Sequence, residues 1–462
     1  MELYTMKLKL KKITSVLVGA MLVMPGTLFA ESYIVMTKNN QVDQKTIASI
    51  EAMGAKVTNQ LPQVGMLVVE SDDLAIRENL ANIAGVQSTL ADINLQYITP
   101  SELVPHTIKF EEMAASPPNT GDDDFLFDLQ WGHDAVNATE AWEAGITGEG
   151  VRVAVLDSGI SSSHADIVPN LNTSLSTSFI TGEDYDNPPG SHGTHTAGTI
   201  AAANNAYGTI GVAPDAEIVS VKVLSALSGS GPFSSIFAGM IYAADIDADV
   251  INMSLGATIP RNCTFGTEHF PAKDCAELFV ALNRVTHYVN SQGTLIVASA
   301  GNSARDLNHD ASIKSFPAEG TFVVSVSALA PYLWADDSTT DLDVLASYSN
   351  YGKNGIDLGA PGGDFDVFFD IGATPCNGPV VPGRPCYVYD MVLSTVPGGW
   401  SWNAGTSMAA PHVSGVAALI ISENGGKMSP VALRQELSKR ADDIYKPGQD
   451  DESGTGRVSS GY

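Results

Sequence analysis

The feature that most constrains the fold of this chain is an alternation of short apolar segments with longer helical patterns, which begins after Gln130. The apolar segments are rich in Val, Ile, Leu and Ala, which is typical of strands buried on both faces. The predicted strands are residues 151–156, 218–224, 250–255, 295–298 and 322–326, with helical stretches that include 234–244 and 276–290. This alternation predicts the α/β class: a mainly parallel sheet flanked by helices in three layers. Because ligands bind beyond the carboxyl ends of such strands, we expect the functional site after Leu156, Leu255 and Ala298.

The first thirty residues have the composition of an export signal. Lysines at positions 7, 9, 11 and 12 precede an apolar run over residues 13–24, and the small residue Ala30 follows. This pattern predicts a signal peptide over residues 1–30 that is removed from the mature chain. The alternative is a transmembrane anchor, but the run is shorter than the about 20 residues that a spanning helix needs.

The net charge limits the partners that the chain can have. The formal charge is -28, and removal of a leader with four Lys and one Glu lowers it by three, to -31. A surface this acidic repels nucleic acid and acidic membranes. We therefore expect no nucleic-acid partner and no membrane contact after signal removal. The export signal predicts a secreted protein, extracellular or alternatively periplasmic, and we expect it to be a monomer.

A smaller module precedes the large sheet. Residues 31–99 are expected to form an α/β unit, with strands at 33–37 and 66–70 and helices at 43–53 and 74–83. Residues 100–124 contain four prolines, a glycine and three consecutive Asp residues, which predicts an exposed linker. Residues 125–462 then form the large domain. Taken alone, this arrangement equally fits two ordinary domains joined by a tether.

Four cysteines lie in the second half of the chain as two sequence-local pairs. An exported chain favours disulfides, and four cysteines allow three connectivities. We favour Cys263 with Cys275 and Cys376 with Cys386, because each pair closes a short loop. The spacings match no compact zinc site.

Three residues have the types and local settings that nucleophilic catalysis needs. Asp157 follows the strand 151–156, and His192 and Ser407 each lie at the predicted start of a helix. Each has an ordinary alternative: a turn aspartate, a metal pair of His192 with His195, and a helix cap. Their joint occurrence favours catalysis, in which the imidazole takes the serine proton and the carboxylate holds the imidazole tautomer.

Attack on an amide places negative charge on the carbonyl oxygen, which requires hydrogen-bond donors. Asn302 directly follows a predicted strand, within Ser299-Ala300-Gly301-Asn302. Its side-chain N–H, together with the backbone N–H of Ser407, can stabilise that charge. An isolated Ala-Gly-Asn is usually a turn, and here its place in the chain order decides.

Five segments in order resemble the subtilase family of serine peptidases. They are Asp157-Ser158-Gly159, His192-Gly193-Thr194-His195, Ser254-Leu255-Gly256, Gly301-Asn302 and Gly405-Thr406-Ser407-Met408-Ala409. The resemblance spans about residues 130–458. It implies a subtilisin-like fold and an endopeptidase that cleaves protein or peptide substrates through an acyl-enzyme on Ser407, with the roles given above for Asp157, His192 and Asn302.

The resemblance also implies where a substrate binds. Two strands would hold it in extended form between them: Gly229-Ser230-Gly231 and Ser254-Leu255-Gly256. The pocket for the side chain before the scissile bond would be lined by Ser299, Ala300, Gly301 and, at its floor, Ser315. This small, uncharged lining favours medium or large apolar side chains.

A calcium site is a further implication of the resemblance. The loop over residues 203–209 resembles the family's strong calcium loop, and Asp166 has the matching spacing from Asp157. The implied ligands are hard oxygen atoms that suit Ca²⁺, from the side chains of Asp166 and Asn205 and the carbonyls of Ala203, Tyr207 and Thr209. Phe127 stands where the family often has a Gln ligand, so Asp128 or another Asp is expected to replace it.

Residues 31–99 resemble the family's pro-domain, an intramolecular chaperone and inhibitor whose C-terminal end occupies the cleft. The chain is therefore expected to be a zymogen that is cut somewhere between residues 99 and 125. Three segments are insertions relative to small family members: 263–275, 330–343 and 364–390.

Two other functions compete with the peptidase. A non-catalytic binding protein could use the same fold, since fold does not fix function. An esterase could use the same nucleophile. All four catalytic positions are filled, which favours an enzyme.

Overall fold

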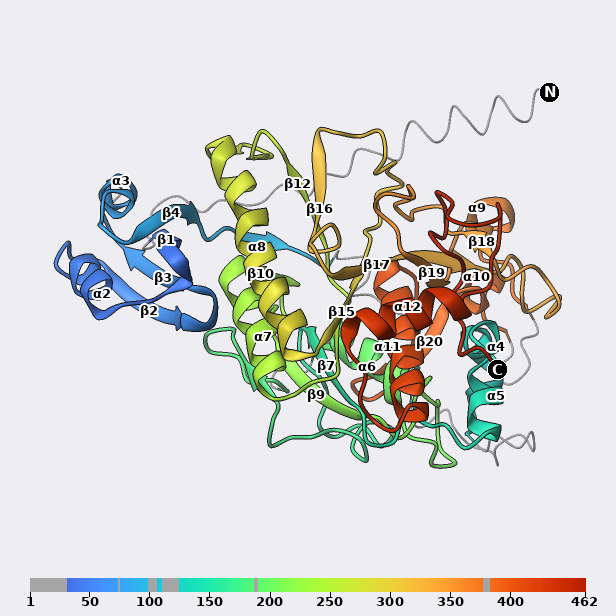
Figure 1. The fold of residues 1–462 in the computed structure, drawn as a ribbon. Helices are drawn as coiled ribbons and strands as arrows, with labels where there is room; N and C mark the ends of the chain where they lie inside the picture. The colour runs from blue at the N-terminus through green and yellow to red at the C-terminus, as the bar shows by residue number, and fades with distance from the viewer. Residues whose placement is uncertain (1–30, 74, 99–105, 110–123, 187–189, 377–382) are drawn as a thin grey trace, which may run out of the picture.

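The computed structural model describes residues 31–73, 75–98, 106–109, 124–186, 190–376 and 383–462 (Figure 1). The predicted signal peptide lies outside these residues. Within them, no helix combines the length and apolar character that crossing a membrane requires.

The N-terminal module contains a four-stranded antiparallel sheet in the order β2-β3-β1-β4. Its strands are β1 (Glu31–Thr37), β2 (Lys56–Leu61), β3 (Met66–Ser71) and β4 (Val86–Ala91). Its helices are α2 (Gln44–Glu51), which begins where Asp43 accepts the N–H of Thr46 at 2.7 Å, and α3 (Ile76–Ala81). The elements predicted for this module are confirmed, with shorter helices, and β2 and β4 are additional.

Both faces of this small sheet are buried, each against a different partner. Tyr33 and Val35 of β1 pack with the module's own helices. Ile34 and Met36, which alternate with them, join the cluster that contains α7 (Phe233–Asp245) and α8 (Ala272–Gln292). Since side chains alternate across a strand, one strand ties the module to the large domain, and Figure 1 shows the module beside α8.

The large domain is built on an eight-stranded sheet in the order β18-β17-β15-β11-β7-β9-β8, with β19 also paired to β17. The expectation of a mainly parallel sheet is confirmed, because β18 is the one antiparallel strand. The strands are β7 (Arg152–Asp157), β8 (Thr177–Ser178), β9 (Glu217–Lys222), β11 (Val250–Met253), β15 (Leu295–Ser299), β17 (Val323–Ala330), β18 (Val344–Leu345) and β19 (Leu358–Pro361).

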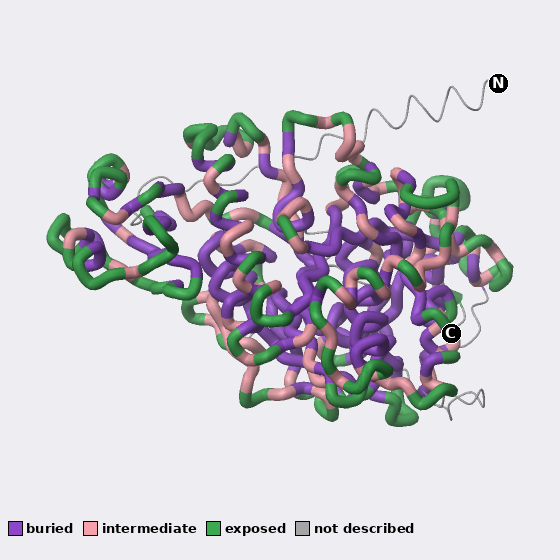
Figure 2. Tube along the Cα trace, in the orientation of Figure 1, coloured by how far each residue is buried: buried purple, intermediate pink, exposed green. Residues whose placement is uncertain are grey.

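Helices cover both faces of this sheet. On β7, Ala154 and Leu156 belong to the cluster with α7 and α8, whereas Val153 and Val155 face α6 (Ser191–Ala201) and α11 (Thr406–Glu423). Figure 2 shows that the sheet and these helices form the buried interior. The remaining helices of four residues or more are α4 (Trp131–Ala135), α5 (Ala138–Glu143), α9 (Val367–Ile371), α10 (Cys386–Tyr389) and α12 (Pro430–Arg440).

Three two-stranded pairs and one three-stranded sheet complete the fold. β10 (Ser230–Pro232) pairs with β5 (Asn94–Gln96), β12 (Ala257–Pro260) with β16 (Ile313–Phe316), and β13 (Thr264–Phe265) with β14 (Glu268–His269). The three-stranded sheet has the order β20-β21-β6, from β20 (Val392–Val396), β21 (Gly399–Asn403) and β6 (His106–Lys109). Both preferred disulfides, Cys263 with Cys275 and Cys376 with Cys386, are present.

The prediction of an exposed linker over residues 100–124 is wrong for β6. This strand pairs with β21, and Ile108 is only 1% exposed. The other end of the segment is also buried, since Asp124 is 0% exposed. Proline and aspartate content indicated exposure, but a four-residue strand in an otherwise polar stretch leaves too short a pattern to recognise.

Three buried histidines make the stability of the fold dependent on pH. Burial lowers the pKa of His133 and His195 to about 3 and that of His412 to about 4. The unfolded chain binds these protons near pH 6.5, while the folded chain excludes them. The contribution of these histidines to the free energy of unfolding is therefore complete above about pH 6.5, and it is lost as the pH falls towards 4.

We expect the free energy of unfolding to fall by on the order of 1 kcal/mol per buried histidine for each pH unit below 6.5. Urea denaturation at pH 7 and pH 5 measures this, in a Ser407→Ala background that prevents self-digestion. The ring of His133 contacts the rings of Phe127, Trp142 and His412, so His133→Phe keeps an aromatic packing partner without a titratable group. That variant should lose less stability between the two pH values; an equal loss would contradict the assignment.

Candidate active site

Asp157 and His192 form a buried hydrogen-bonded pair. Asp157 is the last residue of β7, and its two carboxylate oxygens lie 3.0 and 2.9 Å from Nδ1 of His192. The backbone N–H of Ser158 donates to Oδ1 of Asp157 at 2.6 Å. Because a carboxylate only accepts, Nδ1 of His192 carries the proton and Nε2 is the nitrogen that can accept one.

Gly193 permits the close approach of α6 to the end of β7. A Cβ atom at this position would lie 2.4 Å from the carbonyl oxygen of Gly159 and 3.1 Å from Cβ of Asp157. Any larger residue would push the first turn of α6 away from the strand. The glycine after His192 is thus needed for the distance between the imidazole and Asp157.

Ser407 lies in the first turn of α11, as predicted, and is 4% exposed. α11 packs against α6, whose first turn holds His192. Both catalytic candidates are therefore second residues of helices that pack together on one face of the sheet. The first backbone N–H groups of a helix have no intrahelical acceptor, and they favour negative charge at this end.

Asn302 is held by Thr406, a residue to which the sequence analysis gave no role. Oδ1 of Asn302 accepts the backbone N–H of Thr406 at 2.9 Å and its hydroxyl at 2.7 Å. The same hydroxyl accepts the N–H of Gly301 at 3.1 Å. These bonds fix the amide orientation, so that its NH₂ end is the donor on the side away from Thr406. The position of Thr406 directly before the candidate nucleophile was the available signal.

A cavity of about 100 Å³ brings the predicted pocket residues together with Asn302 and Ser407. It is lined by Gly256, Ser299, Ala300, Gly301 and Ser315, and also by Tyr97, Ala257, Thr258, Ser303, Phe316, Asn350 and Thr406. Ser254 and Leu255 precede Gly256 and are buried, where Oγ of Ser254 accepts the side-chain N–H of Asn252 at 3.0 Å.

Two residues that support this pocket were not predicted. Asn350 donates to the carbonyl oxygen of Ala300 at 2.8 Å and accepts the N–H of Ser303 at 3.2 Å, which fixes the pocket wall. Behind the floor, Glu319 accepts the N–H of Ser315 at 2.5 Å. The lining itself is uncharged, as expected, but a carboxylate lies directly behind it.

The chain's own N-terminal region occupies the first predicted substrate strand. β5 pairs antiparallel with β10, so that Gln96 faces Ser230 and Leu95 faces Gly231. Beyond this pairing, the N–H groups of Tyr97 and Ile98 both donate to the carbonyl oxygen of Gly229, at 3.0 and 3.2 Å. Gly229, Ser230 and Gly231 thus pair with an extended segment of the chain itself.

An ion pair between the buried Lys222 and the partly buried Glu183 lies behind Asp157. Lys222, which faces Asp157 in the sheet register, donates to the carbonyl oxygen of Ser158 and lies 2.9 Å from Glu183. Glu183 also accepts the hydroxyl of Ser225 at 2.6 Å, in the loop before β10. Burial lowers the pKa of Lys222, and the hydrogen bond to Glu183 opposes this shift. The sequence analysis did not identify this pair.

The loop over residues 203–209 gathers two acidic side chains. Oδ2 of Asp166 accepts the N–H of Thr209 at 3.0 Å, and Oδ1 of Asp124 accepts the N–H of Ala206 at 2.7 Å. Asp124, not the predicted Asp128, supplies the second carboxylate, because Asp128 lines a separate cavity with Phe127 and Trp131. The three consecutive Asp residues at 122–124 gave no means of choosing among them.

This arrangement fits a calcium ion. Oδ2 of Asp124 and Oδ1 of Asp166 are buried without a hydrogen-bond partner among the described residues. Burial raises the pKa of Asp124 to about 6 and also raises that of Asp166, and the charge of Asp166 adds to the shift of Asp124. Two buried carboxylates that repel each other are stabilised by a hard divalent cation.

Comparisons with known proteins place this geometry in a family. Residues 148–456 match the model of the subtilase family. M-protease of Shouchella clausii is 38% identical over 314 residues, which are 68% of this chain and 64% of M-protease. Subtilisin Savinase of Lederbergia lenta is 37% identical over 314 residues, which are 68% of this chain and 91% of that protein. The match thus spans less than two thirds of the length of M-protease.

Solved structures have the same fold. The epidermin leader peptide processing serine protease of Staphylococcus aureus superposes with a TM-score of 0.72 at 22% identity, covering 94% of this chain and 97% of that chain. Fervidolysin of Fervidobacterium pennivorans gives a TM-score of 0.65 at 24% identity, covering 95% of this chain and 61% of that one. With the family model matching more than half of its residues, the chain belongs to the subtilase family.

Proposed function

We propose that this chain is a secreted serine endopeptidase that forms an acyl-enzyme on Ser407 and is made as a self-processing zymogen. The observation that carries the proposal is the buried pair of Asp157 with His192. His192 lies on α6, which packs against α11, the helix of Ser407. Asn302 and Ser407 line one cavity, and β10 pairs with β5, an extended segment of the same chain.

Each residue has one step in the proposed reaction. Nε2 of His192 takes the proton of Ser407 as Oγ attacks the peptide carbonyl, and Asp157 stabilises the imidazolium that forms. Asn302 and the backbone N–H of Ser407 donate to the oxyanion. The leaving amine receives the proton from His192, and a water molecule then hydrolyses the acyl-enzyme by the same route.

Replacing Ser407 with Ala should abolish proteolysis and leave the precursor uncut. The expected loss in kcat is on the order of 10⁶-fold, a figure that comes from the catalytic serine of a subtilisin. Casein hydrolysis and the intact mass of the product measure the two effects. Ser422→Ala is the matched control, since Ser422 lies at the far end of the same helix. Normal processing of Ser407→Ala would exclude self-maturation.

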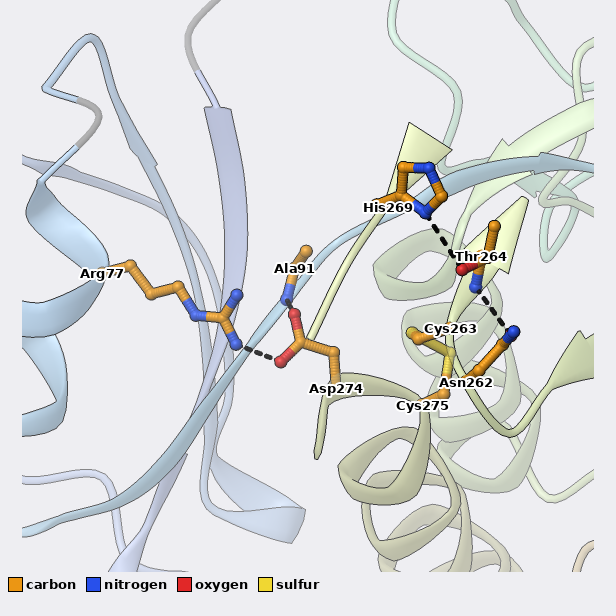
Figure 3. The surroundings of a disulfide bond; sticks show 8 residues. All are labelled: Arg77, Ala91, Asn262, Cys263, Thr264, His269, Asp274 and Cys275. Carbon is orange, nitrogen blue, oxygen red and sulfur yellow. Dashed lines mark hydrogen bonds and ion pairs between the residues drawn. A yellow bond between two sulfur atoms is a disulfide. The ribbon is translucent and has the colours of Figure 1, made fainter. Parts of the chain in front are cut away.

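We propose that residues 31–98 inhibit the enzyme until they are released. Three contacts support this role besides the occupation of β10 by β5. Asp92 accepts the N–H and the hydroxyl of Ser234, at 2.9 and 2.6 Å, in the first turn of α7. Ser88 donates to Glu277 at 2.9 Å, and Arg77 forms an ion pair with Asp274 (Figure 3).

Asp274 is a docking point that the disulfide insertion provides. Its side chain is 1% exposed, and it also accepts the N–H of Ala91 at 3.4 Å. Figure 3 shows it next to Cys275, whose disulfide to Cys263 joins the start of α8 to the preceding loop. Removing Arg77 would leave this buried carboxylate without its cation, which is costly.

Arg77→Ala should therefore shorten the lag between processing and full activity, by roughly 10-fold because the Arg77 side chain is partly exposed. The time course of casein hydrolysis measures the lag. Lys45→Ala, which changes an exposed residue of α2, serves as the control and should keep the normal lag. Asp274→Ala should add little to the effect of Arg77→Ala. If Arg77→Ala behaved like the control, the ion pair would not contribute to inhibition.

We also propose that calcium binds between Asp124 and the loop over residues 203–209. Asp124, Asp166 and Asn205, with backbone carbonyls of the loop, would hold it. Bound there, the ion would neutralise the two carboxylates and stabilise the loop, while taking no part in catalysis.

Chelation by EDTA should lower the melting temperature of the Ser407→Ala protein by roughly 5–10 °C. Asp124→Asn should remove most of this response, because it takes away one of the two buried charges. Asp128→Asn should leave the response intact. Differential scanning calorimetry distinguishes these outcomes: an unchanged melting temperature with EDTA would contradict the calcium site, and equal responses in both variants would contradict the role of Asp124.

A further inference from the structure

The chain contacts the large domain at two places on either side of residues 99–105. Before them, β5 lies on β10, and Ile98 is held at Gly229. After them, β6 pairs antiparallel with β21, where Thr107 faces Ser401 and Ile108 faces Trp400. β21 leads through two residues into α11, which carries Ser407. The two contacts differ in what they bury.

β6 is part of the core of the large domain. Ile108 is 1% exposed and packs in a cluster with Leu126, Leu129, Trp131 and Trp400. These residues come from the large domain, and none belongs to the N-terminal module. β21, to which β6 is paired, is itself buried, and Nε1 of Trp400 donates to Oδ2 of Asp166 at 2.8 Å. Loss of β6 would therefore expose an apolar core and leave β21 as an unpaired edge.

β5 has the opposite character. It pairs with β10 in a two-stranded sheet, and two of its three residues, Asn94 and Gln96, are exposed. The third, Leu95, is half-buried. In sequence the strand belongs to the module that starts at β1, whereas its pairing is with β10 of the large domain. The two residues after β5, Tyr97 and Ile98, are buried in the cluster that contains α7, so release of the module uncovers apolar surface there.

We infer that β6 is a permanent strand of the mature catalytic domain and that the maturation cut lies N-terminal to His106. The inference rests on the proposed self-processing and restricts where the cut can fall. A peptide bond before His106 breaks: its carbonyl carbon bonds to Oγ of Ser407, its amine leaves with the proton from His192, and water then releases the acyl group. The mature chain would keep β6 on β21.

Two measurements on the mature enzyme test this inference. Its intact mass should correspond to a first residue at or before His106, and a first residue after Lys109 would overturn the inference. Ile108→Ala should lower the melting temperature of the mature form by roughly 5–10 °C, and the milder Ile108→Val by less. Leu95→Ala is the matched control and should leave that temperature unchanged, because Leu95 is removed with the pro-domain. Equal melting temperatures in the Ile108 and Leu95 variants would also overturn it.

Failure of self-processing would be visible separately, as a precursor that keeps its full mass. In that case two versions of the Ser407→Ala chain are compared, one with a site for a foreign protease inserted among residues 99–105 and one with that site among residues 110–123. After cleavage, the N-terminal fragment is released in mild urea. The product cut among residues 99–105 keeps β6, so it should melt at a higher temperature than the product cut among residues 110–123. Equal melting temperatures of the two products would show that β6 is dispensable.

Discussion

The structure depends on one constraint: two helices must begin at the same edge of the parallel sheet at which β7 and β15 end. α6 and α11 pack against each other and against this sheet. Their first turns hold His192 and Ser407, while the strand ends supply Asp157 and the loop to Asn302. Parallel strands end at a common edge. The candidate catalytic groups lie up to 250 positions apart in the sequence (157 to 407), and the packing of these two helices on the sheet brings them to one edge.

The parts of the fold that could be predicted are those with strong apolar patterns. β7, β9, β11, β15 and β17 are buried on both faces, and their apolar runs stand out from the flanking sequence. β2 was missed because it is an edge strand with mostly exposed, polar residues, and so it shows no alternation. β5 and β6 are only three and four residues long, and their partners, β10 and β21, are distant in sequence.

The same distinction applies to the site. Asp157, His192, Ser407 and Asn302 lie in local settings that the sequence displays directly, so their types and neighbours were informative. Thr406, Asn350 and the pair of Lys222 with Glu183 act through contacts that form only in three dimensions. Asp124 is the clearest case: the composition showed three adjacent carboxylates, and only burial against residues 205–206 selects one of them.

The two connections of the N-terminal region have different mechanical consequences. One apolar face of β1 packs against the helices of its own module, and the other packs against α7 and α8. The small sheet is therefore buried on its second face only when the large domain is present. Its release must expose Ile34 and Met36 together with the ion pair at Asp274. By contrast, β6 shares its core with Trp131 and Trp400, and Trp400 donates to Asp166, which contacts the loop over residues 203–209. In the proposed zymogen, a single cut between β5 and β6 would convert the intramolecular contact of the module with the large domain into one that can dissociate.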